Sequence, residues 1–150
     1  MVRSMLGKRP EYFEATLQLR EIIPEIERHV RQELKKSGVH IAKEKPLPNG
    51  FDFDLSDSDF TQNLGKKLQE KYGGEYVVSP KLFGHKDGRT IYRLTVLFRG
   101  LPCKKGDKVQ YRGDEYLVLI VGKEITLQNS KTNQKLHLKQ KDFHYLKPSN

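Results

Sequence analysis

Residues 12–20 read YFEATLQLR, and they form the clearest strand pattern in the chain. Phe13, Ala15, Leu17 and Leu19 are apolar, and they alternate with more polar neighbours. Successive side chains of a strand point to opposite faces, so this alternation predicts a strand with one apolar and one polar face. We therefore expect the fold to start from a strand that buries only one of its sides.

A helix is predicted after this strand, between Pro24 and Gly38. Proline is tolerated at a helix start because its missing N–H has no intrahelical partner there, and glycine commonly ends a helix. Apolar residues recur at helical spacing between these two signals. The expected buried stripe comprises Ile22, Ile23, Ile26, Val30 and Leu34.

A second strand–helix unit follows. We expect a short edge strand over residues 39–43, before a turn at residues 46–50. Residues 51–55 alternate apolar and acidic side chains, which predicts a strand, and Ser56 or Asp57 can cap the helix after it. The expected buried stripe of that helix is Phe60, Leu64, Leu68 and Tyr72.

Two antiparallel strands are predicted over residues 75–83 and 90–99. Residues 85–89 join them, and the pair Asp87-Gly88 is a strong hairpin signal. The first 99 residues therefore predict the order strand, helix, strand, helix, strand, strand.

The remaining third of the chain shows no helical period. Short strands separated by turns suggest a small SH3-like barrel, because closure removes exposed strand edges. They are expected near residues 108–111, 115–121, 124–129, 134–138 and 142–146. The predicted fold class is α+β, with residues 1–9 as a flexible lead-in, residues 10–99 as a mixed α/β module and residues 100–150 as the barrel.

The composition favours an anionic partner. The chain has 150 residues, with 28 Lys and Arg against 19 Asp and Glu, which gives a net charge of +9. Residues 1–99 hold 18 basic and 14 acidic residues, whereas residues 100–150 hold 10 and 5, so the predicted barrel is the more one-sided part. Such a balance is typical of proteins that bind nucleic acid.

Other classes of protein find little support in the sequence. A single cysteine, Cys103, excludes an intrachain disulfide framework and a multi-cysteine zinc site, and indicates a reducing, cytoplasmic setting. The chain lacks an apolar run of about 20 residues, so no membrane association is expected. We also expect no cofactor and a monomeric protein. Cys103 precedes two lysines that could lower the pKa of its thiol, but the sequence shows no base or oxyanion site for a nucleophilic role.

Basic side chains are the candidate nucleic-acid-binding residues, because ammonium and guanidinium groups at turns and strand ends can reach phosphates. Aromatic and imidazole rings among the barrel lysines could stack on splayed bases, namely Tyr111, Tyr116, His137, His144 and Tyr145. Basic residues expected to gather at the hairpin tip are Lys81, His85, Lys86, Arg89 and Arg93. The selected site residues are Lys81, Lys86 and Arg89 in the hairpin and Lys104, Lys105, Lys108, Lys131 and Lys135 in the barrel.

Four carboxylates, Asp52, Asp54, Asp57 and Asp59, raise an alternative. Clustered carboxylates suit a hard cation such as Mg²⁺, and this would allow a metal-dependent RNA-processing enzyme. Helix capping already accounts for Asp57 and Asp59, however. We therefore expect no catalytic residues and no metal site.

Several stretches together resemble the Nmd-three family (nonsense-mediated-decay protein three), the export adaptors of the large ribosomal subunit. Residues 12–20 resemble the first strand of the family's middle region, and residues 50–56 (GFDFDLS) resemble a later strand and the start of the helix after it. Residues 92–96 (YRLTV) and 102–107 (PCKKGD) resemble the last strand of that module and the entry to the next.

The resemblance implies a module similar to eukaryotic-type ribosomal protein L twenty-two, followed by a small barrel similar to translation factor five-A. It implies docking on the RNA of the large ribosomal subunit, with ribosomal proteins near the tRNA exit region as further partners. The family's zinc-binding cysteine pairs and leucine-rich export tail have no counterpart here, so we expect a piece of a longer protein or a short, archaeal-like relative.

The expected function is thus a non-enzymatic adaptor in large-subunit maturation, export or quality control. A protein–protein interaction adaptor is the main alternative, and the RNA-processing enzyme is the other.

Overall fold

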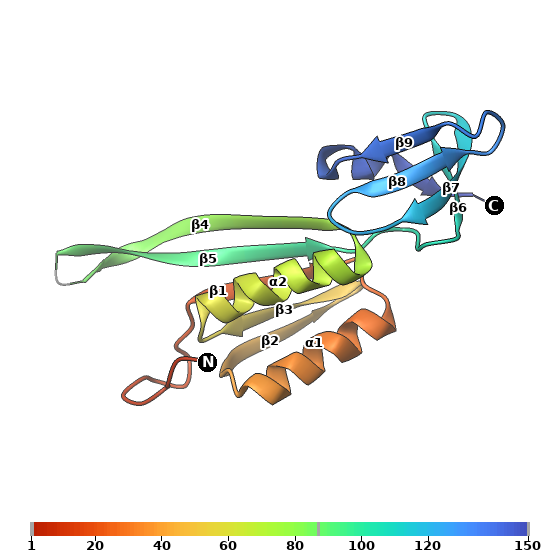
Figure 1. Ribbon diagram of the computed structural model, residues 1–150. Helices are drawn as coiled ribbons and strands as arrows, with labels where there is room; N and C mark the ends of the chain where they lie inside the picture. The colour runs from red at the N-terminus through yellow and green to blue at the C-terminus, as the bar shows by residue number, and fades with distance from the viewer. Residues whose placement is uncertain (1, 87, 150) are drawn as a thin grey trace.

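The computed structural model describes residues 2–86 and 88–149, with only the backbone described at residues 86 and 89–91. It contains two five-stranded sheets and two α-helices (Figure 1), which confirms the predicted α+β class. Neither of these helices is long and apolar enough to cross a membrane.

The first sheet has the strand order β2-β3-β1-β5-β4. Strand β1 pairs in parallel with β5 and antiparallel with β3, and the outer pairs are antiparallel. Both helices cover the same face of this sheet (Figure 1). In chain order, the elements are β1 (Ala15–Arg20), α1 (Pro24–Ser37), β2 (Ile41–Leu47), β3 (Gly50–Leu55), α2 (Ser58–Tyr72), β4 (Glu75–Lys86) and β5 (Arg89–Arg99).

The core of this sheet lies under the helices. The predicted alternation is confirmed for residues 15–20, because Ala15, Leu17 and Leu19 are fully buried while the residues between them are half-buried. Phe13, expected on the same apolar face, precedes β1 and is only half-buried. The partners facing them across the core are Ile26, Val30, Leu34, Phe53, Leu55, Leu64, Leu68, Val96 and Phe98. Ile23 was expected in the helical stripe but is 49 % exposed, since it precedes the helix as its N-cap.

Several boundaries differ from the sequence prediction. Strand β2 is longer than expected and runs through Pro46. Because β2 is an edge strand, one side of its backbone needs no partner, so the missing N–H of a proline is tolerated there. Of the two expected caps, Asp57 is the N-cap of α2. Gly38 ends α1 in the left-handed region, at φ 74°, as predicted.

The second sheet has the order β10-β6-β7-β8-β9 and surrounds a small core of its own. We call residues 100–149 the barrel. The last predicted strand, residues 142–146, is wrong, because those residues mostly form a 3₁₀ turn that places Phe143 in the core. In chain order, the elements are β6 (Lys108–Tyr111), β7 (Asp114–Ile120), β8 (Ile125–Asn129), β9 (Lys135–Leu138), η1 (Gln140–Tyr145) and β10 (Leu146–Pro148).

Gln140 of the barrel forms hydrogen bonds to the start of β4. Its Oε1 accepts hydrogen bonds from the backbone N–H of Tyr76, at 3.0 Å, and from Nε2 of Gln69, at 2.8 Å. Its Nε2 donates to the carbonyl of Tyr76, at 3.1 Å. The amide of Gln140 therefore pairs with the outer edge of β4 as a neighbouring strand would, and it links the barrel to the first sheet.

Candidate nucleic-acid interface

The β4–β5 hairpin projects beyond the rest of the first sheet (Figure 1). Strand β5 pairs with β1 only from Leu94 to Arg99, whereas its pairing with β4 continues to Lys86 and Arg89. We call residues 81–93 the arm. Leu82, Phe83 and Tyr92 on the arm are 56 %, 56 % and 58 % exposed, so it presents large apolar side chains to solvent.

At the base of the arm, Arg93 is held between two aromatic rings. Its guanidinium carbon lies 3.8 Å from the ring centroid of Phe13 and 3.6 Å from that of Phe83. Its Nε also donates a hydrogen bond to the carbonyl of Phe13, at 3.2 Å. A cation stacked on aromatic faces is attracted by the ring quadrupoles, so this arginine is fixed without a carboxylate partner among the described residues.

The predicted hairpin residues do not all lie at a tip. Lys81 is opposite Arg93 at the base of the arm, because strand pairing continues well beyond it. Two like charges face each other there, an arrangement that weakens a sheet. The side chains of Lys86 and Arg89, both predicted site residues, lie outside the described part of the structure, as does residue 87 of the predicted turn.

The predicted barrel lysines are all exposed, but they form two groups. Lys104, Lys105 and Lys108 lie at the end of the barrel that faces the first sheet, where Lys104 and Lys105 line a groove with Ile23 and Tyr72. The other group lies at the opposite end, where the β8–β9 turn packs beside the start of β7 through a hydrogen bond from Ser130 N to Glu115 O. That second group consists of Lys131 and Lys135.

The barrel aromatics are only partly available for stacking. Tyr111 is buried, at 8 % exposure, and contacts Tyr116 and Tyr145 edge-on. Tyr145 is 43 % exposed, and the guanidinium carbon of Arg112 lies 4.7 Å from its ring centroid. Arg112 was not among the predicted site residues; its place in the Arg112-Gly113 turn, at φ 50°, brings it over that ring.

The four aspartates of the metal hypothesis are bound to side chains and backbone groups of the protein itself. Asp52 pairs with Arg20 at 2.7 Å, and Asp54 accepts a hydrogen bond from Thr16 Oγ1 at 2.7 Å, both on the uncovered face of the sheet. Among the described residues, no three His, Cys, Asp or Glu side chains gather where they could share a metal ion.

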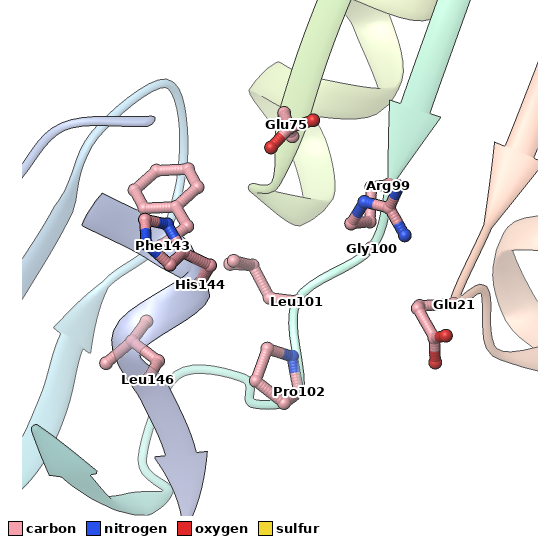
Figure 2. A pocket seen from close by; sticks show the side chains of 9 residues that line it. All are labelled: Glu21, Glu75, Arg99, Gly100, Leu101, Pro102, Phe143, His144 and Leu146. Atoms are coloured by element: carbon pink, nitrogen blue, oxygen red, sulfur yellow. The ribbon is translucent and has the colours of Figure 1, made fainter. Parts of the chain in front are cut away.

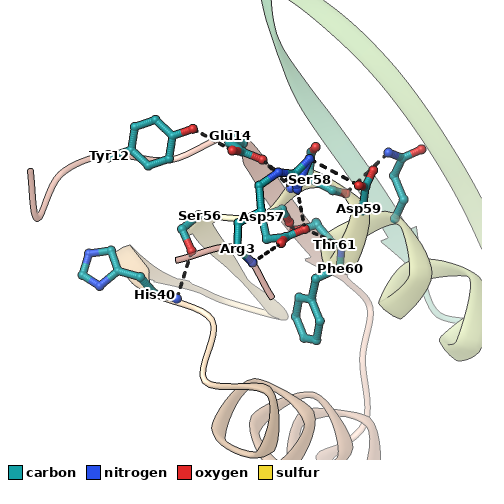
Figure 3. A network of polar contacts seen from close by, with 11 residues as sticks. Arg3, Tyr12, Glu14, His40, Ser56, Asp57, Ser58, Asp59, Phe60 and Thr61 are labelled. Carbon is teal, nitrogen blue, oxygen red and sulfur yellow. Dashed lines mark hydrogen bonds and ion pairs between the residues drawn. The ribbon is translucent and has the colours of Figure 1, made fainter. Parts of the chain in front are cut away.

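Asp57 and Asp59 belong to a network at the start of α2, shown in Figure 3. Asp57 accepts from the backbone N–H groups of Phe60, at 2.9 Å, and Arg3, at 2.7 Å, and the Arg3 guanidinium lies 3.0 Å away. Burial opposes ionisation of Asp57, but these donors outweigh it and hold its pKa below the ordinary value. The segment expected to be a flexible lead-in is thus tied to α2 at Arg3.

The junction between the sheet and the barrel forms a second hollow of about 320 Å³ (Figure 2). Leu101, Pro102, Phe143 and Leu146 give it an apolar wall. At nearby Cys103, the neighbouring lysines do not lower the pKa of the thiol. Burial, together with the charge of Asp107, raises the pKa of the thiol to about 11.

The molecule is thus a basic, two-sheet α+β protein that presents a projecting arm and a lysine-bearing barrel. The family model described as NMD3, second domain, matches residues 12–99. The chain belongs to the NMD3 family, and this confirms the resemblance seen in the sequence over the first module. The matched residues run from the start of β1 to the end of β5 and include the arm. Among curated proteins, none matches the chain significantly.

Proposed function

We propose that this protein is a non-enzymatic adaptor that docks on the large ribosomal subunit by contacting ribosomal RNA. The observation that carries the proposal is membership of the NMD3 family over the module that bears the arm. The net charge of +9 supports it, because a basic surface is attracted to the phosphate backbone.

The distribution of charge suggests how such docking would work. The barrel lysines Lys104, Lys105, Lys108, Lys131 and Lys135 are exposed. In the described part of the barrel, none of them forms an ion pair with a carboxylate, since all ion pairs found lie within residues 3–59. Their charges remain available to neutralise phosphates. Recognition would then follow the shape of the RNA surface rather than base identity.

The wider biological setting is part of the same proposal. We expect a monomer in the cytoplasm that acts in large-subunit maturation or quality control, with ribosomal proteins near the tRNA exit region as further contacts. In an archaeal-like setting, without a nuclear envelope, export would not be its task.

The test is co-sedimentation of the chain with purified large and small ribosomal subunits across a salt series. We expect saturable binding to the large subunit that weakens as salt rises, because released counterions drive the association. Equal binding to both subunits would show that the protein binds RNA in general and does not select the large subunit. No binding at low salt would refute the proposal.

A protein-interaction adaptor is a second candidate, and the exposed apolar residues of the arm favour it. Leu82, Phe83 and Tyr92 are large exposed apolar side chains, and such side chains mark protein contacts where they gather into a patch. Binding to the large subunit that persists unchanged at high salt would favour this candidate over RNA docking.

A further inference from the structure

We propose that the hollow beside the Phe13–Arg93–Phe83 stack binds a single unstacked base of RNA. This inference rests on the proposed function and names the contact that the base of the arm would make. It assigns a binding role to the exposed rings at the base of the arm, which belong neither to the lysine groups of the barrel nor to the buried core.

The stack forms a wall between two hollows. The larger hollow has a volume of about 490 Å³ and the smaller about 210 Å³, and Phe13, Phe83 and Arg93 line both of them. Tyr92 also lines the larger hollow. Its volume lies within the range of small-molecule pockets, about 300–1,000 Å³.

Two aromatic rings at this hollow keep much of their surface free. Phe83 is 56 % exposed and Tyr92 is 58 % exposed, although rings of this size usually bury most of their surface. Phe83 is fixed on one side by its contact with Arg93. A base could therefore stack on a ring that is already held in place, and it would sacrifice little side-chain entropy.

The charges around the larger hollow suit a nucleotide. Lys8 and Arg9 line it together with Arg93, and the Nζ of Lys8 lies 4.7 Å from the ring centroid of Tyr12. Of the two carboxylates in the lining, Glu14 already accepts from the hydroxyl of Tyr12, at 2.6 Å, and from Ser58 N, at 2.9 Å.

On the other side of the stack, Lys81 lines the smaller hollow. Cations on both sides of exposed rings match a base flanked by its two phosphates. Proteins that bind single-stranded nucleic acid combine stacking rings with a basic track in this way. An apolar protein segment would fill the hollow but would gain nothing from the flanking ammonium groups, so RNA is the occupant we favour.

The experiment compares two ligands of equal charge and length. One is a fluorescent oligouridine of about ten nucleotides, and the other is an abasic ribose-phosphate chain of the same length. The proteins are wild type, Phe83→Leu, Tyr92→Leu and the control Ile120→Ala. Leucine keeps an apolar side chain but removes the π face, and Ile120 in the barrel is as exposed as Tyr92, at 58 %.

We expect the wild type to bind the oligouridine at least about tenfold more tightly than the abasic chain, because stacking contributes only where a base is present. Each leucine variant should lose about tenfold in affinity for oligouridine, with no change for the abasic chain and an unchanged salt slope. Ile120→Ala should match the wild type. Melting temperatures confirm that each variant is folded, and Tyr92→Leu leaves the Arg93 stack intact.

Equal affinity of the wild type for the two ligands would overturn the inference, as would unchanged oligouridine binding in both leucine variants. If the leucine variants bind oligouridine like the wild type but bind large subunits more weakly, the arm contacts protein and the inference is also wrong. The proposed function fails separately, when the wild type does not bind large subunits selectively, and the oligouridine comparison does not depend on that outcome.

Discussion

The first module and the barrel use their charges differently. In the first module, Arg3, Arg20 and Arg31 pair with carboxylates, and Arg93 is stacked between two rings. In the described part of the barrel, no lysine or arginine forms such a pair, although the barrel carries the larger excess of positive charge for its length. Arginines of the first module thus support structure, whereas the barrel lysines have no carboxylate partner among the described residues and are available to bind a partner molecule.

This difference predicts that substitutions in the two regions affect different properties. Removing a paired charge in the first module should lower the free energy of unfolding, with little effect on binding. Removing an exposed lysine in the barrel should weaken binding and leave the free energy of unfolding nearly unchanged. Surface substitutions change stability by less than about 0.5 kcal/mol.

The largest loss of stability is expected from Asp57→Ala. The side chain of Asp57 is 3 % exposed and accepts from Phe60 N, Arg3 N and the Arg3 guanidinium. Removing an N-cap costs up to about 2 kcal/mol, and losing hydrogen bonds between Arg3 and the charged carboxylate adds about 1.5–3 kcal/mol, so we expect a loss of about 2–4 kcal/mol. Denaturant unfolding measures it.

Asp59→Ala is the matched control, because Asp59 also pairs with Arg3 but its side chain is 74 % exposed. We expect a change of less than about 0.5 kcal/mol. Equal losses in the two variants would show that burial of Asp57 is not what makes its contacts stabilising.

The same residue predicts a dependence on pH. The pKa of Asp57 is lowered in the folded protein, so its contribution is complete above the unfolded pKa, about 4. The contribution disappears as pH falls through the lowered folded value. The difference in free energy of unfolding between the wild type and Asp57→Asn should therefore become smaller as pH falls below about 4. A gap that stays constant would contradict the lowered pKa.

A smaller effect, on affinity, is expected from the barrel lysines. Lys104, Lys105 and Lys108 changed together to Gln should weaken binding to large subunits by at least about tenfold, which is about 1.4 kcal/mol. Lys131 and Lys135 changed together test the opposite end of the barrel. Sedimentation measures the affinity. If one of these two variants binds as tightly as the wild type, the end of the barrel that carries its lysines is not part of the docking surface.

Gln140→Ala tests the contact between the two regions. The substitution removes three hydrogen bonds, to Tyr76 N, Tyr76 O and Gln69 Nε2. Because the edge of β4 can then bond to water, the net cost should be only about 1–2 kcal/mol. We expect faster hydrogen exchange at the amide of Tyr76, whereas the exposed Gln134→Ala should leave exchange there unchanged.

The smallest effect is expected from Arg31→Gln. Arg31 pairs with Glu27 at 2.9 Å and Glu44 at 2.8 Å, and its side chain is 41 % exposed. Exposed pairs contribute about 0.2–1 kcal/mol and are screened by salt. Its destabilisation should therefore shrink in high salt. An effect as large as that of Asp57→Ala would contradict the ranking.

The elements of the fold were largely predictable from the sequence because each carries a local signal. Apolar alternation marks β1 and β3, and Pro24 and Gly38 bracket α1. The 3₁₀ turn before β10 was missed, because Phe143 and Tyr145 alternate as in a short strand, whereas the buried pair Phe143 and Leu146 has the spacing of three that a 3₁₀ turn brings to one side.

The candidate site was less predictable because its contacts join distant residues. Arg93 meets Phe13 across 80 positions of sequence, and Gln140 meets Tyr76 across 64. No local pattern encodes either contact. The barrel lysines selected from the sequence are exposed, but charge counting could not show that they occupy two ends of the barrel.

The most direct test of this division of roles is the slope of large-subunit binding against salt concentration. The slope should be measured for the wild type, for the variant with all five barrel lysines changed to Gln, and for Arg31→Gln. For every phosphate that a lysine no longer neutralises, the slope should flatten by about 0.7–0.9. The account predicts a flatter slope for the lysine variant and a wild-type slope for Arg31→Gln. A wild-type slope in the lysine variant would contradict it.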